Sequence, residues 1–202
     1  MANKNHELDE RIIKSARKEF LKHGYRNASL HKIAANAKLT TGALYTRYHG
    51  KDDLFKSLIK NVLDQIESIS NSMKQNYFDI QIDCDVKTIS NVIGSEMQIY
   101  NQLMVDYYDE CFLFYCRSEG SSVDKMLQDM MNNKIEQTIK YLKMIARPDA
   151  DLSGIELLME TQFYLFKKEL EYNYQNKNKV ASIKMVDVFN SAGWKAIFEE
   201  IL

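Results

Sequence analysis

The stretch Ser29–Lys51, SLHKIAANAKLTTGALYTRYHGK, predicts two short helices separated by a tight turn. Its first half carries apolar residues at three- and four-residue spacing, namely Leu30, Ile33, Ala34 and Ala37. Ser29 and Thr40 are placed as N-caps, because a side-chain oxygen there can accept backbone N–H groups of the first helical turn. We therefore expect one helix from Leu30 to Ala37 and a second from Thr41 to about Tyr48.

The second predicted helix has an inner and an outer face. Leu44 and Tyr48 are four residues apart and are expected to face inward. The outward set is short and polar with one cation, and consists of Thr41, Ala43, Thr46 and Arg47. Small side chains let a helix approach base edges in the major groove, hydroxyls donate or accept, and arginine suits guanine or phosphate. This face predicts a DNA-reading helix, and the alternative is an ordinary helical hairpin in an all-α core.

Residues at the border of this face are candidates for phosphate contacts. The Tyr45 phenol can bond a phosphate at the rim of the groove, and Lys51 lies where the next helix begins. The full candidate DNA-binding set is Ser29, Thr40, Thr41, Ala43, Tyr45, Thr46, Arg47, Tyr48 and Lys51.

Many positions of this stretch match one known pattern. The matching residues are Ile33, Ala34, Ala37, Thr40, Gly42, Leu44, Tyr45, Tyr48, Lys51 and Leu54. Together they resemble the helix-turn-helix of the TetR family of bacterial transcriptional regulators, over about Ile12 to Leu58, roughly a quarter of the chain. Two positions depart from the family pattern, which usually has glycine where this chain has Lys38 and phenylalanine where it has Tyr48. Lys38 implies either a turn without a left-handed residue or strain of about 1 kcal/mol.

The resemblance implies an all-α protein with two parts. Residues 1–50 would be a three-helix helix-turn-helix DNA-binding domain, and residues 51–202 a helical effector-binding and dimerisation domain. It further implies a regulator, more often a repressor, that binds a palindromic operator in double-stranded DNA as a homodimer. A small-molecule effector would release it.

Charge is divided unevenly along the chain. Residues 1–60 contain 13 Lys and Arg against 6 Asp and Glu, whereas residues 61–202 contain 14 against 22. A basic N-terminal part (residues 1–60, the basic head) followed by an acidic remainder fits a protein in which one end faces DNA. The sequence has no apolar run long enough for a membrane span and no hydrophobic signal core at MANKNHELDER, which predicts a cytoplasmic protein. Three unevenly spaced cysteines, Cys84, Cys111 and Cys116, fit a reducing compartment.

The remaining chain predicts further helices. The expected ranges are Glu7–His23 ended by Gly24, Lys51–Lys74, Val86–Arg117 with a break near Met104–Asp106, a helix after a Ser121/Asp124 capping box that stops at Arg147-Pro148, Leu152–Tyr174, and Val180–Leu202. Tyr77–Asp85 breaks the helical pattern and predicts a linker.

The helical body holds the candidate effector and dimer residues. An adaptable apolar cavity could be lined by Met97, Tyr100, Met104, Tyr108, Phe112, Met126, Met130 and Phe163, although such a stripe can equally be solid core. The last two helices are expected to pair with their copies in a dimer, with contacts from Phe166, Leu170, Phe189, Ala192, Gly193 and Ala196. The alternative is that both stripes only close the core of one protomer.

Motifs for enzymatic chemistry are not found in the sequence. It has no Gly-rich phosphate loop, no His-rich metal spacing and no nucleophile elbow, so we expect no enzyme activity, cofactor or metal. Two other functions remain open. One is a DNA-binding architectural or partner-recruiting protein without a small-molecule pocket, and the other is an enzyme or carrier whose basic head serves another purpose.

Overall fold

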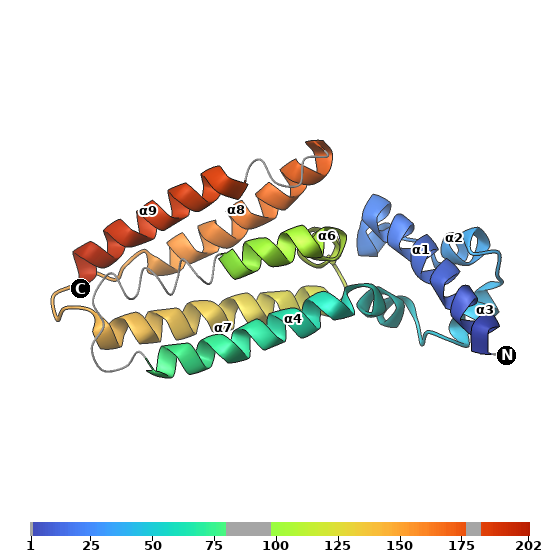
Figure 1. The fold of residues 1–202 in the computed structure, drawn as a ribbon, viewed down its shortest axis with the longest axis horizontal. Coiled ribbons are helices and arrows are strands. Elements are labelled where there is room, and N and C mark those ends of the chain that lie inside the picture. The colour runs from blue at the N-terminus through green and yellow to red at the C-terminus, as the bar shows by residue number, and fades with distance from the viewer. Residues whose placement is uncertain (1, 80–97, 177–182) are drawn as a thin grey trace. The chain divides into compact units, whose positions relative to one another are not determined.

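The structure, a computed structural model, describes residues 2–79, 98–176 and 183–202 (Figure 1). Every regular element in this part of the chain is a helix, so the all-α prediction is confirmed. The helices are α1 (Ala2–Asn27), α2 (Leu30–Asn36), α3 (Thr41–Tyr45), α4 (Lys51–Asp79), α6 (Tyr108–Cys116), α7 (Ser122–Ile145), α8 (Ile155–Asn176) and α9 (Ile183–Ile201), with residues 98–106 also helical. None of the described helices is long and apolar enough to cross a membrane.

The chain divides into two compact units. Unit 1 comprises residues 1–63 and 109–128, and unit 2 comprises residues 64–108 and 129–202. Both α4 and α7 therefore begin in unit 1 and end in unit 2. These units differ from the predicted ranges 1–50 and 51–202, because residues 51–63 and 109–128 belong to unit 1. The assignment of DNA-binding and effector-binding roles to the two predicted ranges stays a prediction.

The core of unit 1 includes an apolar stripe along α1. Ile12, Ala16 and Phe20 are fully buried, and Ile33 and Leu44 bring α2 and α3 onto the same core. Helix α2 packs against both α1 and α3. Such burial supplies most of the stability of these elements, because helices of five to seven residues are marginal on their own.

Helix α1 is kinked at Gly24, which has φ 71° and ψ 167°. The predicted end of the first helix is confirmed at this residue, although helical structure resumes after it up to Asn27. Tyr25 stacks on Phe20 with ring centroids 6.2 Å apart, and Phe55 of α4 meets both rings edge-on. The left-handed φ of Gly24 is readily adopted only without a Cβ.

Residues of the segment 109–128 bond to α1 in unit 1. The Tyr25 backbone N–H donates to the Arg117 carbonyl at 2.7 Å. The Arg17 guanidinium lies 2.7 Å from Glu110. Arg26 pairs with Glu119 at 2.8 Å. These contacts join α1 to residues about 90 positions later in the chain, which explains why the segment is part of this unit.

The core of unit 2 is formed by α7, α8 and α9. Ile135 and Leu142 of α7 pack with Ile155 and Met159 of α8 and with Phe198 of α9. The Tyr108 hydroxyl donates to the Leu170 carbonyl at 2.8 Å, and the Trp194 indole N–H donates to Gln162 at 3.0 Å. The buried aromatic hydroxyl and indole groups that these bonds satisfy would otherwise destabilise the core.

Some predicted element boundaries differ from the structure. Tyr77–Asp79, expected in a linker, is the last part of α4, and residues 80–85 of that linker lie outside the described residues. The helical break falls at Tyr107 instead of Met104–Asp106. The Ser121 hydroxyl accepts from the Asp124 backbone N–H at 3.1 Å, as in a capping box, but the Asp124 carboxylate accepts from Gly120 instead of Ser121.

Candidate nucleic-acid interface

Both α2 and α3 begin at a side-chain capping bond. The Ser29 hydroxyl accepts from the Lys32 backbone N–H at 3.4 Å, and the Thr40 hydroxyl accepts from Ala43 at 3.2 Å, so both predicted N-caps are confirmed. A hydroxyl that accepts a capping bond still has its own hydrogen to donate. Each cap is therefore chemically able to donate to a phosphate oxygen.

Lys38 adopts the left-handed conformation that the family pattern reserves for glycine, with φ 59°. Its backbone N–H donates to Ala35 at 3.0 Å, and the Leu39 N–H donates to Ala34 at 2.9 Å. This pair of bonds is the Schellman arrangement that ends a helix. The sequence left open either a turn without a left-handed residue or a strained left-handed one. Lys38 adopts the strained left-handed conformation.

Helix α3 presents a small, hydroxyl-rich outer side. Leu44 is buried and anchors the helix, whereas Thr46 is exposed and Tyr45 is 52% exposed. Thr41 and Ala43 are half-buried. The Thr46 hydroxyl donates to the Ala43 carbonyl at 2.8 Å, so its oxygen is left as an outward acceptor. Small side chains with donor and acceptor groups of this kind suit the edges of bases in the major groove.

The helical period predicted that Arg47 points outward, but its side chain instead contacts α1. Its Nε atom lies 2.7 Å from Asp9 Oδ1 of α1, and its side chain is 24% exposed. The Asp9 carboxylate competes for the guanidinium because a charge-assisted hydrogen bond is stronger than a neutral one. A direct DNA contact by Arg47 stays a prediction, and such a contact must displace or share Asp9.

Tyr48 and Lys51 are also held by intramolecular contacts. The half-buried Tyr48 side chain lies near Ser57, and burial raises the pKa of its phenol above the ordinary value. The Lys51 ammonium donates to the Arg26 carbonyl at 3.1 Å and lies 4.8 Å from the centre of the Tyr25 ring. Burial lowers the pKa of Lys51, and Glu19 opposes this effect. Both residues therefore brace unit 1, and their expected phosphate contacts are additional roles not yet tested.

Helix α1 exposes a row of cations on unit 1. Arg11, Lys14, Lys18 and Lys22 are exposed, whereas Arg17 is partly buried against Glu110. This row follows the three- and four-residue spacing of one helical face. It supplies a positive surface of the kind that attracts a polyanion.

The candidate effector residues are divided between the two units. Phe112 and Met126 belong to unit 1, and Met97 lies outside the described residues. The other five candidates belong to unit 2. Among all the candidates, Met104, Tyr108 and Phe112 are buried, with at most 6% of each residue exposed. An open groove of about 650 Å³ in unit 2 is instead lined by Asn132, Ile135, Glu136, Ile139, Lys140, Lys143, Met144, Glu156 and Glu160. None of the candidate residues lines this groove.

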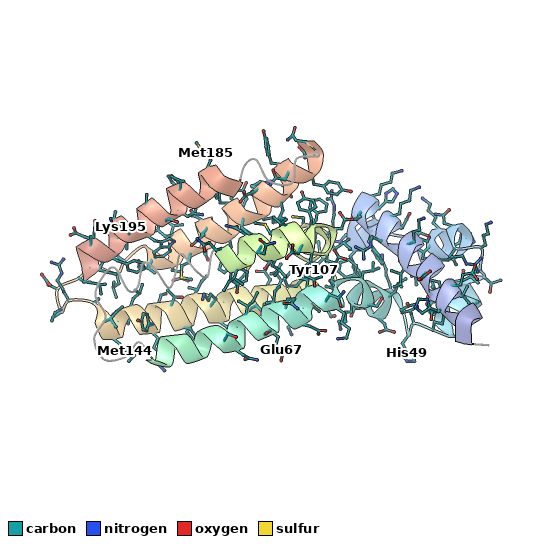
Figure 2. The ribbon with its side chains drawn as sticks, in the orientation of Figure 1. His49, Glu67, Tyr107, Met144, Met185 and Lys195 are labelled. Atoms are coloured by element: carbon teal, nitrogen blue, oxygen red, sulfur yellow. The ribbon has the colours of Figure 1, made fainter. Side chains whose placement is uncertain are left out.

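The candidate dimer residues fall into two groups. Leu170 is fully buried within the protomer and Phe166 is half-buried, so Leu170 is a core residue and not a surface contact. Phe189 is 72% exposed, and Ala192, Gly193 and Ala196 are exposed beside it. Met185 and Val188 extend this apolar side of α9, and Figure 2 shows Met185 projecting from the helix. Exposed apolar faces of this kind are common at interaction sites, and the dimer contact expected here stays a prediction.

The Cys111 thiol is buried within the protomer. Burial, with smaller effects from Glu110 and Cys116, raises the pKa of the Cys111 thiol to about 12. A thiol with such a pKa is protonated and unreactive at neutral pH. Within the described residues, no group of three His, Cys, Asp or Glu side chains is placed to hold a metal ion.

Comparisons with known proteins point to one family. Residues 12–58 match the family model described as bacterial regulatory proteins, tetR family. The helix-turn-helix-type transcriptional regulator HbdR of Aromatoleum sp. strain CIB is 39% identical over 61 residues, covering 30% of this chain and 27% of that protein. The chain thus aligns with about a quarter of the length of this curated relative.

Solved structures share the fold over nearly the whole chain. A TetR-like transcriptional regulator from Rhodococcus sp. RHA1 gives a TM-score of 0.61 at 13% identity, covering 95% of this chain and 93% of that one. The fatty acid degradation regulator FadR of Bacillus halodurans gives 0.58 at 16% identity, with 94% and 93% covered. FadR of Bacillus subtilis, solved in complex with stearoyl-CoA, gives 0.52 at 13% identity, with 94% and 96% covered. At these identities the likeness shows the fold alone.

Proposed function

Because the chain belongs to the TetR family of bacterial regulatory proteins through residues 12–58, we propose that it is a cytoplasmic transcriptional repressor. It binds a palindromic operator as a homodimer, and a small-molecule effector releases it. The observation that carries this proposal is the outer side of α3. A five-residue helix, capped by Thr40 and anchored by buried Leu44, offers Thr41, Ala43 and Thr46 to a groove.

Phosphate contacts would add affinity and register to this reading surface. The hydroxyls of Ser29 and Thr40 lie at the N-termini of α2 and α3, where backbone N–H groups and the helix dipole favour an anion. The exposed cations of α1 increase the attraction without sequence preference. Tyr45 is available at the rim because its ring is largely exposed.

Dimerisation is supported by the apolar side of α9. A Cβ added to Gly193 would meet no atom within 4 Å in the protomer, so packing inside one chain does not require a glycine there. Glycine in a helix interior destabilises it by about 1 kcal/mol relative to alanine. A second copy of the helix, packed closely against this residue, would explain why a glycine stands there. To read a palindrome, two copies must hold their α3 helices about 34 Å apart or at a multiple of the DNA repeat.

Regulation by an effector would act through helix α4. Helix α4 runs from unit 1 into unit 2 without interruption, so a tilt of its second half would move its first half. Effector binding in the helical body would thus change the separation of the two reading helices and lower operator affinity. Because a fold relative was solved with stearoyl-CoA, fatty acyl thioesters are the first ligands to test for release of DNA.

Selection of duplexes from random DNA tests the proposed function. We expect enrichment of an inverted repeat, and a chain that enriches no sequence in low salt would contradict the proposal. Thr46→Val should weaken binding to the enriched duplex because it removes the outward oxygen of an exposed threonine. Thr161→Val is the matched control, since the Thr161 hydroxyl of α8 also donates to its own helix, at 2.7 Å from the Leu157 carbonyl.

A further inference from the structure

Residues that follow α3 contact neighbouring helices. The Arg47 guanidinium bonds to Asp9 of α1 at 2.7 Å, and the half-buried Tyr48 side chain lies near Ser57 of α4. The His49 backbone N–H donates to the Asp53 carboxylate at 2.9 Å. The chain that leaves α3 is therefore held on two sides, by hydrogen bonds to α1 through Arg47 and to α4 through His49.

Helix α3 depends on such contacts for its direction. It has five residues, and its buried anchor is Leu44. A helix of this length is not stable alone, and one buried side chain leaves rotation about that anchor possible. Arginine at a hydrogen-bonded site fixes geometry through its planar guanidinium, unlike a mobile ammonium. The bond from Nε to a carboxylate on α1 thus restricts the direction of α3 at its C-terminal end.

We propose that Asp9 is a positioning residue of the DNA-reading surface, which acts through Arg47 to hold α3 at the angle that base recognition requires. This inference rests on the proposed function. In this proposal Arg47 orients α3. The sequence alone predicted that Arg47 contacts bases or phosphate. The two assignments give opposite effects for Asp9. If Arg47 contacts DNA, loss of Asp9 releases a cation and strengthens binding, whereas loss of a brace weakens selective binding.

The test uses Asp9→Asn, Arg47→Gln and the double variant in the full chain. Glu10→Gln is the control, because it removes the neighbouring carboxylate of α1, which is 69% exposed and pairs with His6. We expect the affinity ratio between selected and scrambled duplexes to fall about three- to tenfold in each single variant. The affinity ratio of the double variant should be no lower than that of Arg47→Gln alone. Glu10→Gln should keep the affinity ratio of the unmodified chain.

Salt dependence separates positioning from contact. An arginine that neutralises a phosphate adds about 0.9 to the slope of log affinity against log salt concentration. Positioning predicts that Arg47→Gln keeps the slope of the unmodified protein. A lowered slope in Arg47→Gln, or tighter selective binding by Asp9→Asn, would overturn the proposal.

Amide hydrogen exchange of residues 40–48 tests the brace without DNA. Exchange in this segment should be faster in Asp9→Asn and Arg47→Gln than in Glu10→Gln. Unchanged exchange in all three variants would refute the brace even if DNA binding is found. If exchange is faster in Asp9→Asn and Arg47→Gln but the unmodified chain selects no duplex, the brace exists and the proposed DNA-reading function is wrong.

Discussion

The Asp52 carboxylate accepts two hydrogen bonds from Ser122, one from its backbone N–H at 2.9 Å and one from its hydroxyl at 2.5 Å. The two residues lie at the starts of α4 and α7 and are 70 positions apart in the chain. One carboxylate therefore stabilises the N-termini of two helices, where the helix dipole favours negative charge. Through this contact the beginning of α7 is part of unit 1.

Loss of this contact should destabilise the protein. Asp52→Asn removes the charge that strengthens both bonds, and we expect the free energy of unfolding in urea to fall by about 1 kcal/mol, since the side chain is partly exposed. Ser122→Ala should cost a similar amount. Combining the two substitutions should cost clearly less than their sum, because both remove the same bond. Strict additivity would show that the contact contributes nothing.

The same carboxylate predicts a dependence of stability on pH. Partial burial alone would raise the pKa of Asp52, but hydrogen bonds from Ser122 and from Lys56 outweigh it and hold the pKa below its ordinary value. A lowered folded-state pKa stabilises the protein above the unfolded value of about 3.9. The advantage of the parent over Asp52→Asn should be constant near neutral pH and shrink as pH falls below about 4. An advantage that grows on acidification would contradict this assignment.

Lys38 provides a test of backbone strain. Lys38→Gly places the residue that suits φ 59° at this position, and we expect a gain of up to about 1 kcal/mol in the free energy of unfolding. Lys38→Ala keeps the Cβ while removing the charge, so it serves as the control and should give no gain. Equal stabilisation by both variants would mean that the charge, and not the left-handed conformation, is unfavourable.

The exposed side of α9 predicts the state of association. Phe189→Glu should convert the dimer to a monomer, because it introduces two charges at the centre of a self-complementary apolar interface. Sedimentation velocity across a range of concentrations measures the change. Met144→Glu is the control, since Met144 is 63% exposed on α7, outside the α9 stripe, and is labelled in Figure 2. A parent chain that is monomeric at every concentration would remove the basis for a palindromic operator.

The local features of the fold could be predicted from the sequence because they depend on neighbouring residues. The caps at Ser29 and Thr40, the end of the first helix at Gly24 and the buried stripe through Ile12 and Phe20 all follow from short spacing rules. The left-handed turn at Lys38 was one of two stated possibilities, and backbone geometry decided between them.

The tertiary contacts could not be predicted in this way. Arg47 meets Asp9 across 38 positions and Asp52 meets Ser122 across 70, and no periodic pattern links such distant residues. Helical period alone placed Arg47 outward, since it carries no information about a carboxylate on another helix. For the same reason Leu170 could be placed on an apolar stripe, but its complete burial within the protomer could not be distinguished from a dimer contact.

Fluorescence anisotropy with two duplexes tests the central claim most directly, namely that α3 reads DNA sequence. The selected palindrome and a scrambled duplex of equal length and composition would be titrated with the unmodified chain between 50 and 200 mM salt. We predict that the selected duplex binds about a thousandfold more tightly, and that both affinities fall with salt. Equal affinities for the two duplexes, or no binding to either in low salt, would contradict the account.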